Sequence, residues 1–179
     1  TLSLTSIGDT ATFTPTVKDA AGSVVAGATV TWATSDESVA TVSDAGLVTA
    51  VADGSATITA TSGVLEATAT VTVAQAAASI ELSDTVLTFS SLGDTIQLTA
   101  TVKDASGNVI SDATVTWASA TTDVATVSSA GLVTSVGNGT TSIIAVYGSI
   151  NATATVTVAQ AFYLAANGVT IICSSADVG

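Results

Sequence analysis

Apolar and polar residues alternate along short stretches of this chain. From Thr10 to Val17, threonines at even positions alternate with apolar residues at odd positions. The same period returns in three further stretches, residues 28–32, 56–60 and 67–73. A period of two with threonine on one face is typical of a half-buried β-strand. The pattern therefore predicts a chain built from short strands.

Turn residues separate these stretches. Residues 43–46 end in Gly46 and lie between two β-branched runs, which predicts a hairpin. Asp53-Gly54 supplies another turn, and no stretch has the 3.6-residue period of a helix. About seven short strands with such turns predict an all-β fold, namely a Greek-key β-sandwich of the immunoglobulin type.

The whole pattern occurs twice at a constant offset. Val17-Lys18-Asp19 returns as Val102-Lys103-Asp104, 85 residues later, and Trp32 returns as Trp117. Each tryptophan is the largest side chain available to fill the core of its copy. We predict two tandem domains, at residues 1–75 and 76–160, followed by a tail at residues 161–179.

The two copies differ at their beginnings. The strand-like residues 79–83 open the second copy and have no counterpart ahead of Thr1, whereas a similar stretch begins after the second copy. In an alignment without gaps, apolar residues of this tail match apolar residues of the second copy: Phe162 with Ile80, Leu164 with Leu82, Val169 with Leu87 and Ile171 with Phe89. We expect the first domain to lack its first strand and the tail to resemble a donor strand.

An unfilled strand position is costly for a small domain. Two buried aliphatic side chains contribute about 1.5–3 kcal/mol each, against about 5–15 kcal/mol for a whole domain. The unpaired edge is also a template for another chain. The resulting hypothesis is head-to-tail strand addition into a homopolymer, with Phe162, Tyr163, Leu164, Val169 and Ile171 as the subunit contact. Two alternatives stay open: the chain is cut from a longer array whose third domain begins at the tail, or the tail folds back on its own chain.

Charge and hydropathy exclude two kinds of partner. The chain has 14 acidic residues against two cations, Lys18 and Lys103, and a formal charge of −12. Phosphate recognition needs clusters of Arg or Lys, so we expect no nucleic-acid partner. No apolar run approaches the roughly 20 residues of a spanning helix, so we expect no membrane insertion. The lack of Met and of a leader at Thr1 predicts a processed, exported chain that is extracellular or at the cell surface.

Residue types suited to catalysis are scarce. The chain has no His and no Arg, which are favoured for proton transfer and for stabilising anions, so we predict no enzyme and no cofactor. No Asp-rich calcium loop occurs and we predict no metal site. A weak calcium site that combines Gln75, Glu81 or Asp84 with backbone carbonyls stays open as an alternative.

Three smaller features complete the candidate chemistry. Cys173 has no partner in the chain, so it is either an apolar strand residue or half of an intersubunit disulfide. Lys18 and Lys103 are either solvated or part of internal isopeptide bonds. Asn138 and Asn151 each begin an N-glycosylation pattern.

Longer motifs carry a family resemblance. Each copy contains Val-Lys-Asp-x-x-Gly, then Ala-Thr-Val-Thr-Trp-Ala, then Val-Ala-Thr-Val-Ser-x-Ala-Gly-Leu-Val-Thr. The chain thereby resembles the bacterial immunoglobulin-like group 2 (BIg2) domain, twice over nearly its whole length. The resemblance implies a surface-exposed or virion-attached sandwich of the kind found in adhesins, surface layers and phage appendages, and it implies no particular ligand. The absent first strand at Thr1 departs from the family pattern.

Two functions are compatible with these features. The first is a structural protomer of an extracellular fibre or surface assembly that polymerises through its tail. The second is an adhesin stalk or phage virion decoration module that binds cell-surface glycans. Aromatic side chains usually mark glycan sites, and Tyr147, Phe162 and Tyr163 are the ones that the core pattern leaves unused.

Overall fold

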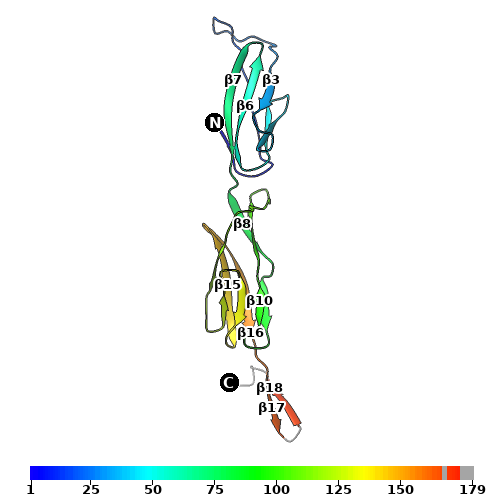
Figure 1. The fold of residues 1–179 in the computed structure, drawn as a ribbon, viewed down its shortest axis with the longest axis vertical. Coiled ribbons are helices and arrows are strands. Elements are labelled where there is room, and N and C mark those ends of the chain that lie inside the picture. The colour runs from blue at the N-terminus through cyan, green and yellow to red at the C-terminus, as the bar shows by residue number, and fades with distance from the viewer. Residues whose placement is uncertain (167–168, 174–179) are drawn as a thin grey trace. The chain divides into compact units, whose positions relative to one another are not determined.

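The structure is a computed structural model that describes residues 1–166 and 169–173, and for the strands after residue 161 it describes the backbone alone. Every regular element in this described part is a β-strand. The chain divides into two compact units, one formed by Thr1–Ala77 with Asp104–Val109 and the other by Ala78–Lys103 with Ile110–Gly179. The predicted all-β fold is confirmed (Figure 1).

The first unit contains two sheets. Its strands are β1 (Leu2–Leu4), β2 (Thr10–Thr12), β3 (Thr31–Thr34), β4 (Ala40–Val42), β5 (Leu47–Ala50), β6 (Gly54–Ser62) and β7 (Leu65–Val73). One sheet has the order β1-β7-β6-β3 and the other has the order β2-β5-β4. β1 runs parallel to β7, whereas β6 and β7 form a long antiparallel hairpin. Such two-layer packing is the arrangement expected of a β-sandwich.

Alternating residues of these strands build the first core. In β6, Ala56 and Ile58 are buried while Thr57 and Thr59 are partly exposed, as a period of two requires. The buried core consists of Leu4, Val39, Ala40, Val48, Ala50, Ala56, Ile58, Val71 and Val73. Trp32 is only partly buried and packs against this cluster from its rim. The predicted core role of the tryptophan therefore applies to the edge of the core and not to its centre.

The second unit repeats this arrangement and adds strands. Its elements are β8 (Ala77–Leu82, which begins in the first unit), β9 (Val86–Phe89), β10 (Thr95–Gln97), β11 (Ala100–Asp104), β12 (Thr116–Ser119), β13 (Ala125–Val127), β14 (Leu132–Ser135), β15 (Gly139–Tyr147) and β16 (Ile150–Val158). The sheets have the orders β12-β15-β16-β9 and β10-β14-β13, and β11 pairs with β8. The pair formed by β8 and β11 has no counterpart among the strands of the first unit.

The prediction of one strand from Thr10 to Val17 is wrong. β2 ends at Thr12, and the residues that follow form only an isolated bridge between Lys18 and Val24. The matching stretch of the second unit is divided between β10 and β11, which lie in different sheets. The alternation runs through both strands because each buries one face, so the period alone cannot reveal where the chain leaves one sheet for the other.

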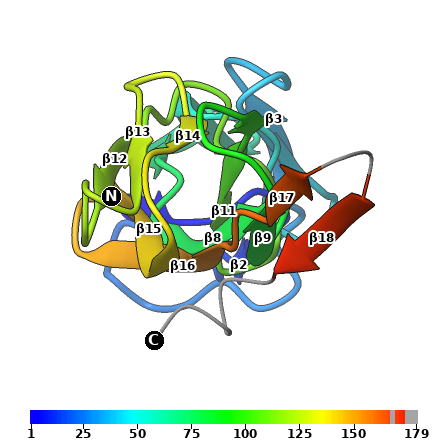
Figure 2. The same cartoon turned by 90° about the horizontal axis from the view of Figure 1, so that it is seen from below.

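The tail contains β17 (Phe162–Ala166) and β18 (Val169–Cys173). These strands pair antiparallel with each other, with Leu164 opposite Ile171 (Figure 2). The segments that match them in sequence are not paired with each other, because β8 pairs with β11 and β9 pairs with β16. The donor role predicted for the tail stays a prediction.

Candidate strand-acceptor site

In the second unit, β8 closes one edge of the sandwich. The Ser83 N–H donates to the Thr99 carbonyl oxygen at 3.0 Å, and the Thr99 N–H donates to Ser83 Oγ at 3.2 Å. Because Ser83 follows β8 and Thr99 precedes β11, the two strands run antiparallel. Leu82 packs against the core, and Glu81 forms an ion pair with Lys103. One short strand therefore supplies an apolar anchor, a charged contact and backbone hydrogen bonds.

Several apolar residues of the second unit are fully enclosed. Leu98, Ala145 and Ala154 are 0% exposed, and Val102 is 2% exposed. They come from the segment at β11 and from the hairpin of β15 and β16. Their exposed fractions can be compared with those of the matching residues in the first unit.

The matching residues of the first unit are less enclosed. Phe13, Val17, Ala60 and Ala69, which lie 85 residues earlier, are all partly exposed. No strand of the first unit takes the position of β8, because β1 pairs with β7 in the way that β9 pairs with β16. The residues that are more exposed in the first unit therefore match enclosed residues of the unit that contains β8.

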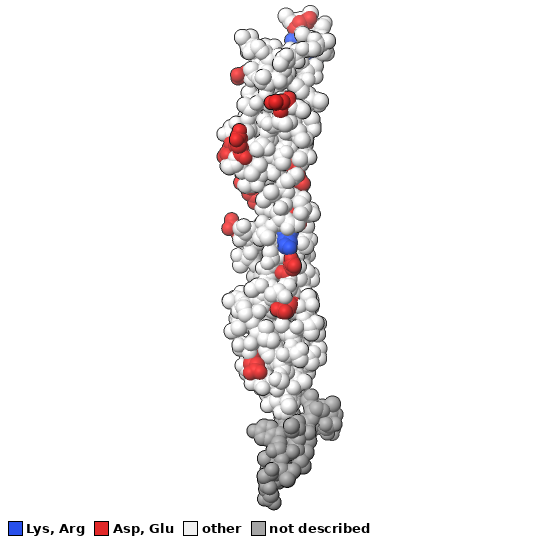
Figure 3. Space-filling model, turned by 90° about the vertical axis from the view of Figure 1, so that its right-hand side faces the viewer, with Lys and Arg blue, Asp and Glu red and all other residues white. Residues whose placement is uncertain are grey.

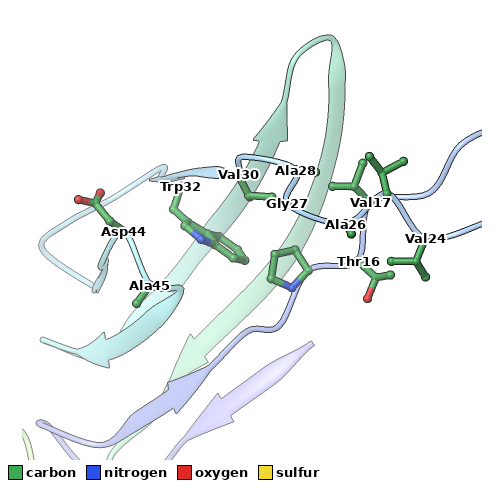
Figure 4. Close-up of a pocket in the computed structure, with 12 residues that line it drawn as sticks. Thr16, Val17, Val24, Ala26, Gly27, Ala28, Val30, Trp32, Asp44 and Ala45 are labelled. Atoms are coloured by element: carbon green, nitrogen blue, oxygen red, sulfur yellow. The ribbon is translucent and has the colours of Figure 1, made fainter.

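This region forms a groove, which we call the acceptor groove. It is bounded by the segment 13–17, by Trp32, and by Ala60, Ala67 and Ala69 of the hairpin of β6 and β7. The rings of Phe13 and Trp32 stack with their centroids 6.2 Å apart. Figure 4 shows the adjoining hollow, where the Trp32 side chain points inward and Thr16 and Val17 lie on the segment across from it. An apolar floor beside a free backbone edge suits an added strand.

The backbone of the segment 13–17 carries the free edge. Among the described residues, the N–H and C=O groups of Thr14 and Thr16 have no hydrogen-bond partner, although Thr99, the counterpart of Thr14, is bonded to Ser83. Val17 directs its carbonyl the other way, to the N–H of Val25 at 2.9 Å. Pro15 lies between the two threonines and has no N–H to offer. The edge therefore presents alternate residues for pairing.

A buried carboxylate in the first unit is a second polar feature. Asp104 is 2% exposed, and its Oδ2 accepts hydrogen bonds from the Ile7 N–H at 3.1 Å and from Gln75 Nε2 at 3.0 Å. Its Oδ1 accepts from the N–H groups of Ser106 and Asn108. Burial alone would raise the pKa of Asp104, but hydrogen bonds from Gln75, Asn108 and Ile7 outweigh burial and lower it to about 2. Both carboxylate oxygens of Asp104 therefore accept hydrogen bonds from within the protein.

The sequence does not distinguish Asp104 from Asp19. Asp19 Oδ1 accepts from the N–H groups of Ala21 and Ser23, so it makes the same turn, but Asp19 is exposed. Additional donors at Oδ2 separate the two aspartates: the Ile7 N–H and Gln75 Nε2 are remote in sequence, and Asn108 Nδ2 is local at 3.3 Å. The local signal is limited to Asn108, where the first copy has Ser23.

The residues of the alternative calcium site have contacts of their own, and that alternative stays open. Gln75 donates to Asp104, Glu81 pairs with Lys103, and Asp84 is exposed. Within the part of the chain that the structure describes, no group of three or more His, Cys, Asp or Glu residues is placed to hold a metal ion. Hydrogen bonding and charge from Lys103 lower the pKa of Glu81.

The remaining candidate residues lie as follows. Asn138 Oδ1 accepts the Gln160 N–H at 2.8 Å, which repeats the bond from Gln75 N–H to Asp53 Oδ1 in the first copy. Asn151 is exposed in β16, and Tyr147 is partly buried at the end of β15. Glycosylation at the two asparagines stays a prediction.

The tail residues predicted as contacts lie in β17 and β18. Phe162, Tyr163 and Leu164 belong to β17, whereas Val169, Ile171 and Cys173 belong to β18. Their side chains lie outside the described part of the structure. The subunit contact and the intersubunit disulfide therefore stay predictions.

The surface carries little positive charge. On the face drawn in Figure 3, acidic side chains occur in small separate groups on a mostly uncharged surface.

No helix in the residues described by the structure has the length and apolarity that crossing a membrane requires.

Comparisons with known proteins give matches at the level of domains. Among curated proteins, none matches this chain. A solved structure of domains 4 and 5 of the S-layer protein SbsC is 26% identical, with 82% of this chain and 80% of that chain covered and a TM-score of 0.45. A longer structure of the same S-layer protein is 21% identical with a TM-score of 0.45, and the match covers 88% of this chain but only 30% of that chain. A crystal structure of invasin, a bacterial integrin-binding protein, is 19% identical over 81% of this chain and 34% of that chain, with a TM-score of 0.47.

The family is established by a direct match of the sequence. The family model of the bacterial Ig-like domain (group 2) matches residues 5–73 and again residues 76–158. These two matches cover most of the chain and confirm the resemblance drawn from its motifs. The chain belongs to the bacterial immunoglobulin-like group 2 family, with two tandem copies of the domain.

Proposed function

We propose that this chain is a structural protomer of an extracellular fibre or surface assembly, and that its copies join head to tail by strand addition. One observation carries the proposal. The acceptor groove of the first unit is open at the place where β8 closes the second unit, and the tail repeats the apolar pattern of β8. The same chain thus contains an unfilled position and a segment of the type that fills it.

Other observations support a structural function. Both copies of the domain are immunoglobulin-like, and the described residues contain no cluster of acidic, His or Cys side chains suited to metal chemistry. A net charge of −12 opposes nonspecific association of copies, so contact through a defined strand is favoured. The structural neighbours include S-layer and invasin proteins, and on the family resemblance we place this chain at the cell surface or outside the cell.

The test is deletion of the tail. The full chain and a chain that ends at Gln160 are compared by sedimentation velocity and negative-stain imaging over a range of protein concentrations. We expect the full chain to form larger species and the shortened chain to remain monomeric. A chain that lacks only residues 174–179 is the matched control, because it keeps both tail strands. Assembly that persists without the tail, or a full chain that stays monomeric at all concentrations, contradicts the proposal.

The alternative function is a glycan-binding stalk or virion module, and it can be tested with the same samples. A monomeric full chain that binds a glycan array would favour it. Loss of binding on changing Tyr147→Ala would then locate the site at the end of β15.

A further inference from the structure

We infer that the acceptor groove takes β17 of a second copy and not β18, antiparallel to the segment 14–17 and with Ala165 opposite Thr14. This inference rests on the proposed function and adds to it which strand is donated and in which register. Each part follows from a comparison of the two units of this chain.

The choice of strand follows from what is already occupied. β1 takes the position of β9: Leu4 lies opposite Val73 on β7, as Phe89 lies opposite Val158 on β16. The part of the tail that matches β9 therefore finds its position filled. The part that matches β8 finds its position open, and that part is β17. Donation of β17 alone leaves the acceptor's β1 in place.

The register follows from the hydrogen bond that joins Ser83 to Thr99. Ser83 aligns with Ala165 of the tail, and Thr99 aligns with Thr14 of the first unit. In this register the free backbone groups of Thr14 and Thr16 face the added strand. Leu164 then takes the place of Leu82, which packs on the core of the second unit. In this register Leu164 is placed over Phe13 and the alanines of the acceptor groove.

Pro15 is compatible with pairing along this edge. Alternate residues of an antiparallel strand bond to a given neighbour, so with Thr14 and Thr16 facing the added strand, Pro15 faces away and its missing N–H is not needed. A slip of the donor by one residue would leave Thr14 and Thr16 as the bonding residues of the acceptor, but it would turn every side chain of the donor to the opposite face. The second copy has Ala100 at this position, where the attached β8 is part of the same chain.

The donor must first leave its partner. In the free chain, β17 pairs with β18 from Phe162 opposite Cys173 to Ala166 opposite Val169. A hairpin of two strands alone is marginally stable in water. Exchange into a groove with an apolar floor is therefore favoured over the hairpin, and opening of the hairpin precedes assembly.

Cysteine crosslinking between two different chains tests the strand and its register. Both chains carry Cys173→Ser. One carries Thr14→Cys and the other carries Ala165→Cys, so that a disulfide joins them only across the proposed junction. Controls replace the second chain by one with Leu164→Cys, shifted by one residue, or Val169→Cys, placed in β18. After mild oxidation we expect several-fold more crosslinked dimer for Ala165→Cys than for either control.

The outcomes separate this inference from the proposed function. Preferred crosslinking by Val169→Cys, or equal crosslinking by all three, overturns the assignment while tail-dependent assembly still supports the proposed function. Loss of both crosslinking and assembly overturns both. A monomer that binds a peptide of the sequence of residues 77–84 but never its own tail would show that the groove accepts a different strand, which also overturns the inference.

A disulfide within the tail tests the hairpin step. Ala165 lies opposite Thr170 in the hairpin, so Ala165→Cys with Thr170→Cys, in a chain that carries Cys173→Ser, can join β17 to β18. We expect the oxidised chain to remain monomeric and the reduced chain to assemble. Each single cysteine variant under the same oxidant is the control. Assembly of the oxidised double variant at the rate of the controls would contradict the requirement for opening.

Discussion

The same substitution at two matching alanines tests whether the acceptor groove is truly open in the free chain. Ala60 lies opposite Trp32 across β6 and β3, and Ala145 lies opposite Trp117 across β15 and β12. Ala145 is fully buried, whereas Ala60 is partly exposed and lines the groove. The changes Ala60→Leu and Ala145→Leu therefore place an identical side chain in an open site and in a closed one.

The two substitutions are expected to change the stability of their units in opposite directions. Inserting extra methylenes into a packed core costs about 1–3 kcal/mol, so Ala145→Leu should destabilise the second unit by that amount. At Ala60 the added carbons have room, and each buried CH₂ contributes up to about 0.8 kcal/mol of stability. Ala60→Leu should therefore leave the first unit unchanged or slightly more stable. Because the larger side chain occupies the place proposed for Leu164, it should also prevent assembly.

Each unit contains one tryptophan, so the two transitions can be followed separately. Urea unfolding is monitored by fluorescence in a chain that ends at Gln160, with Trp117→Phe to observe the first unit through Trp32 and with Trp32→Phe to observe the second. Equal destabilisation at Ala60 and Ala145 would refute the reasoning, because it would mean that the first unit is as closed as the second. Normal assembly of the Ala60→Leu full chain would refute the proposed position of the donor.

Two further predictions concern positions away from the groove. The low pKa of Asp104, about 2 against an ordinary 3.8, means that its contribution to stability is complete above pH 3.8 and is lost as the pH falls toward 2. Asp104→Asn should therefore lower the melting temperature at pH 7 more than Asp19→Asn, and much less so at pH 2; equal effects at both pH values would contradict the role of its hydrogen bonds. Gly131 has φ +82°, and a Cβ there would meet the Leu98 carbonyl, so Gly131→Ala should destabilise the second unit by more than about 1–2 kcal/mol in urea unfolding. Gly148→Ala, at φ +57° but with open space around the added methyl, is the control and should cost less.

The strands were predictable from sequence where the pattern and the pairing agree. In the hairpin of β6 and β7, alternation of Thr with Ala, Ile and Val both marks the strands and selects the residues that are buried. The segment 13–17 shows the same alternation but forms no regular strand. A strand is maintained by hydrogen bonds to a neighbouring strand, and no described strand pairs with this segment in the structure. Pattern therefore predicts the capacity to pair, and tertiary context decides whether pairing occurs.

The candidate site was predictable only in part for the same reason. Comparing the two copies directs attention to this edge, and in the structure no described strand pairs with it. The significance of Pro15 required the hydrogen bond between Ser83 and Thr99, which shows which residues of the edge face the missing strand. Residue type alone would have suggested only that this edge is protected from pairing.

The tail and β8 share a sequence pattern but not a partner, and this difference determines what kind of assembly to expect. In the free chain β17 is bonded to β18, so its transfer to another copy exchanges one set of backbone hydrogen bonds for another. Such an exchange contributes little net free energy, because hydrogen bonds are made and lost in similar number. The driving force must then come from the apolar surface that is newly buried, which in the second unit is provided by Leu82 over a fully enclosed floor. Assembly of this chain should therefore depend on the apolar anchors of the donor and on the open floor around Ala60, and its strength should be set by the groove rather than by the length of the strand.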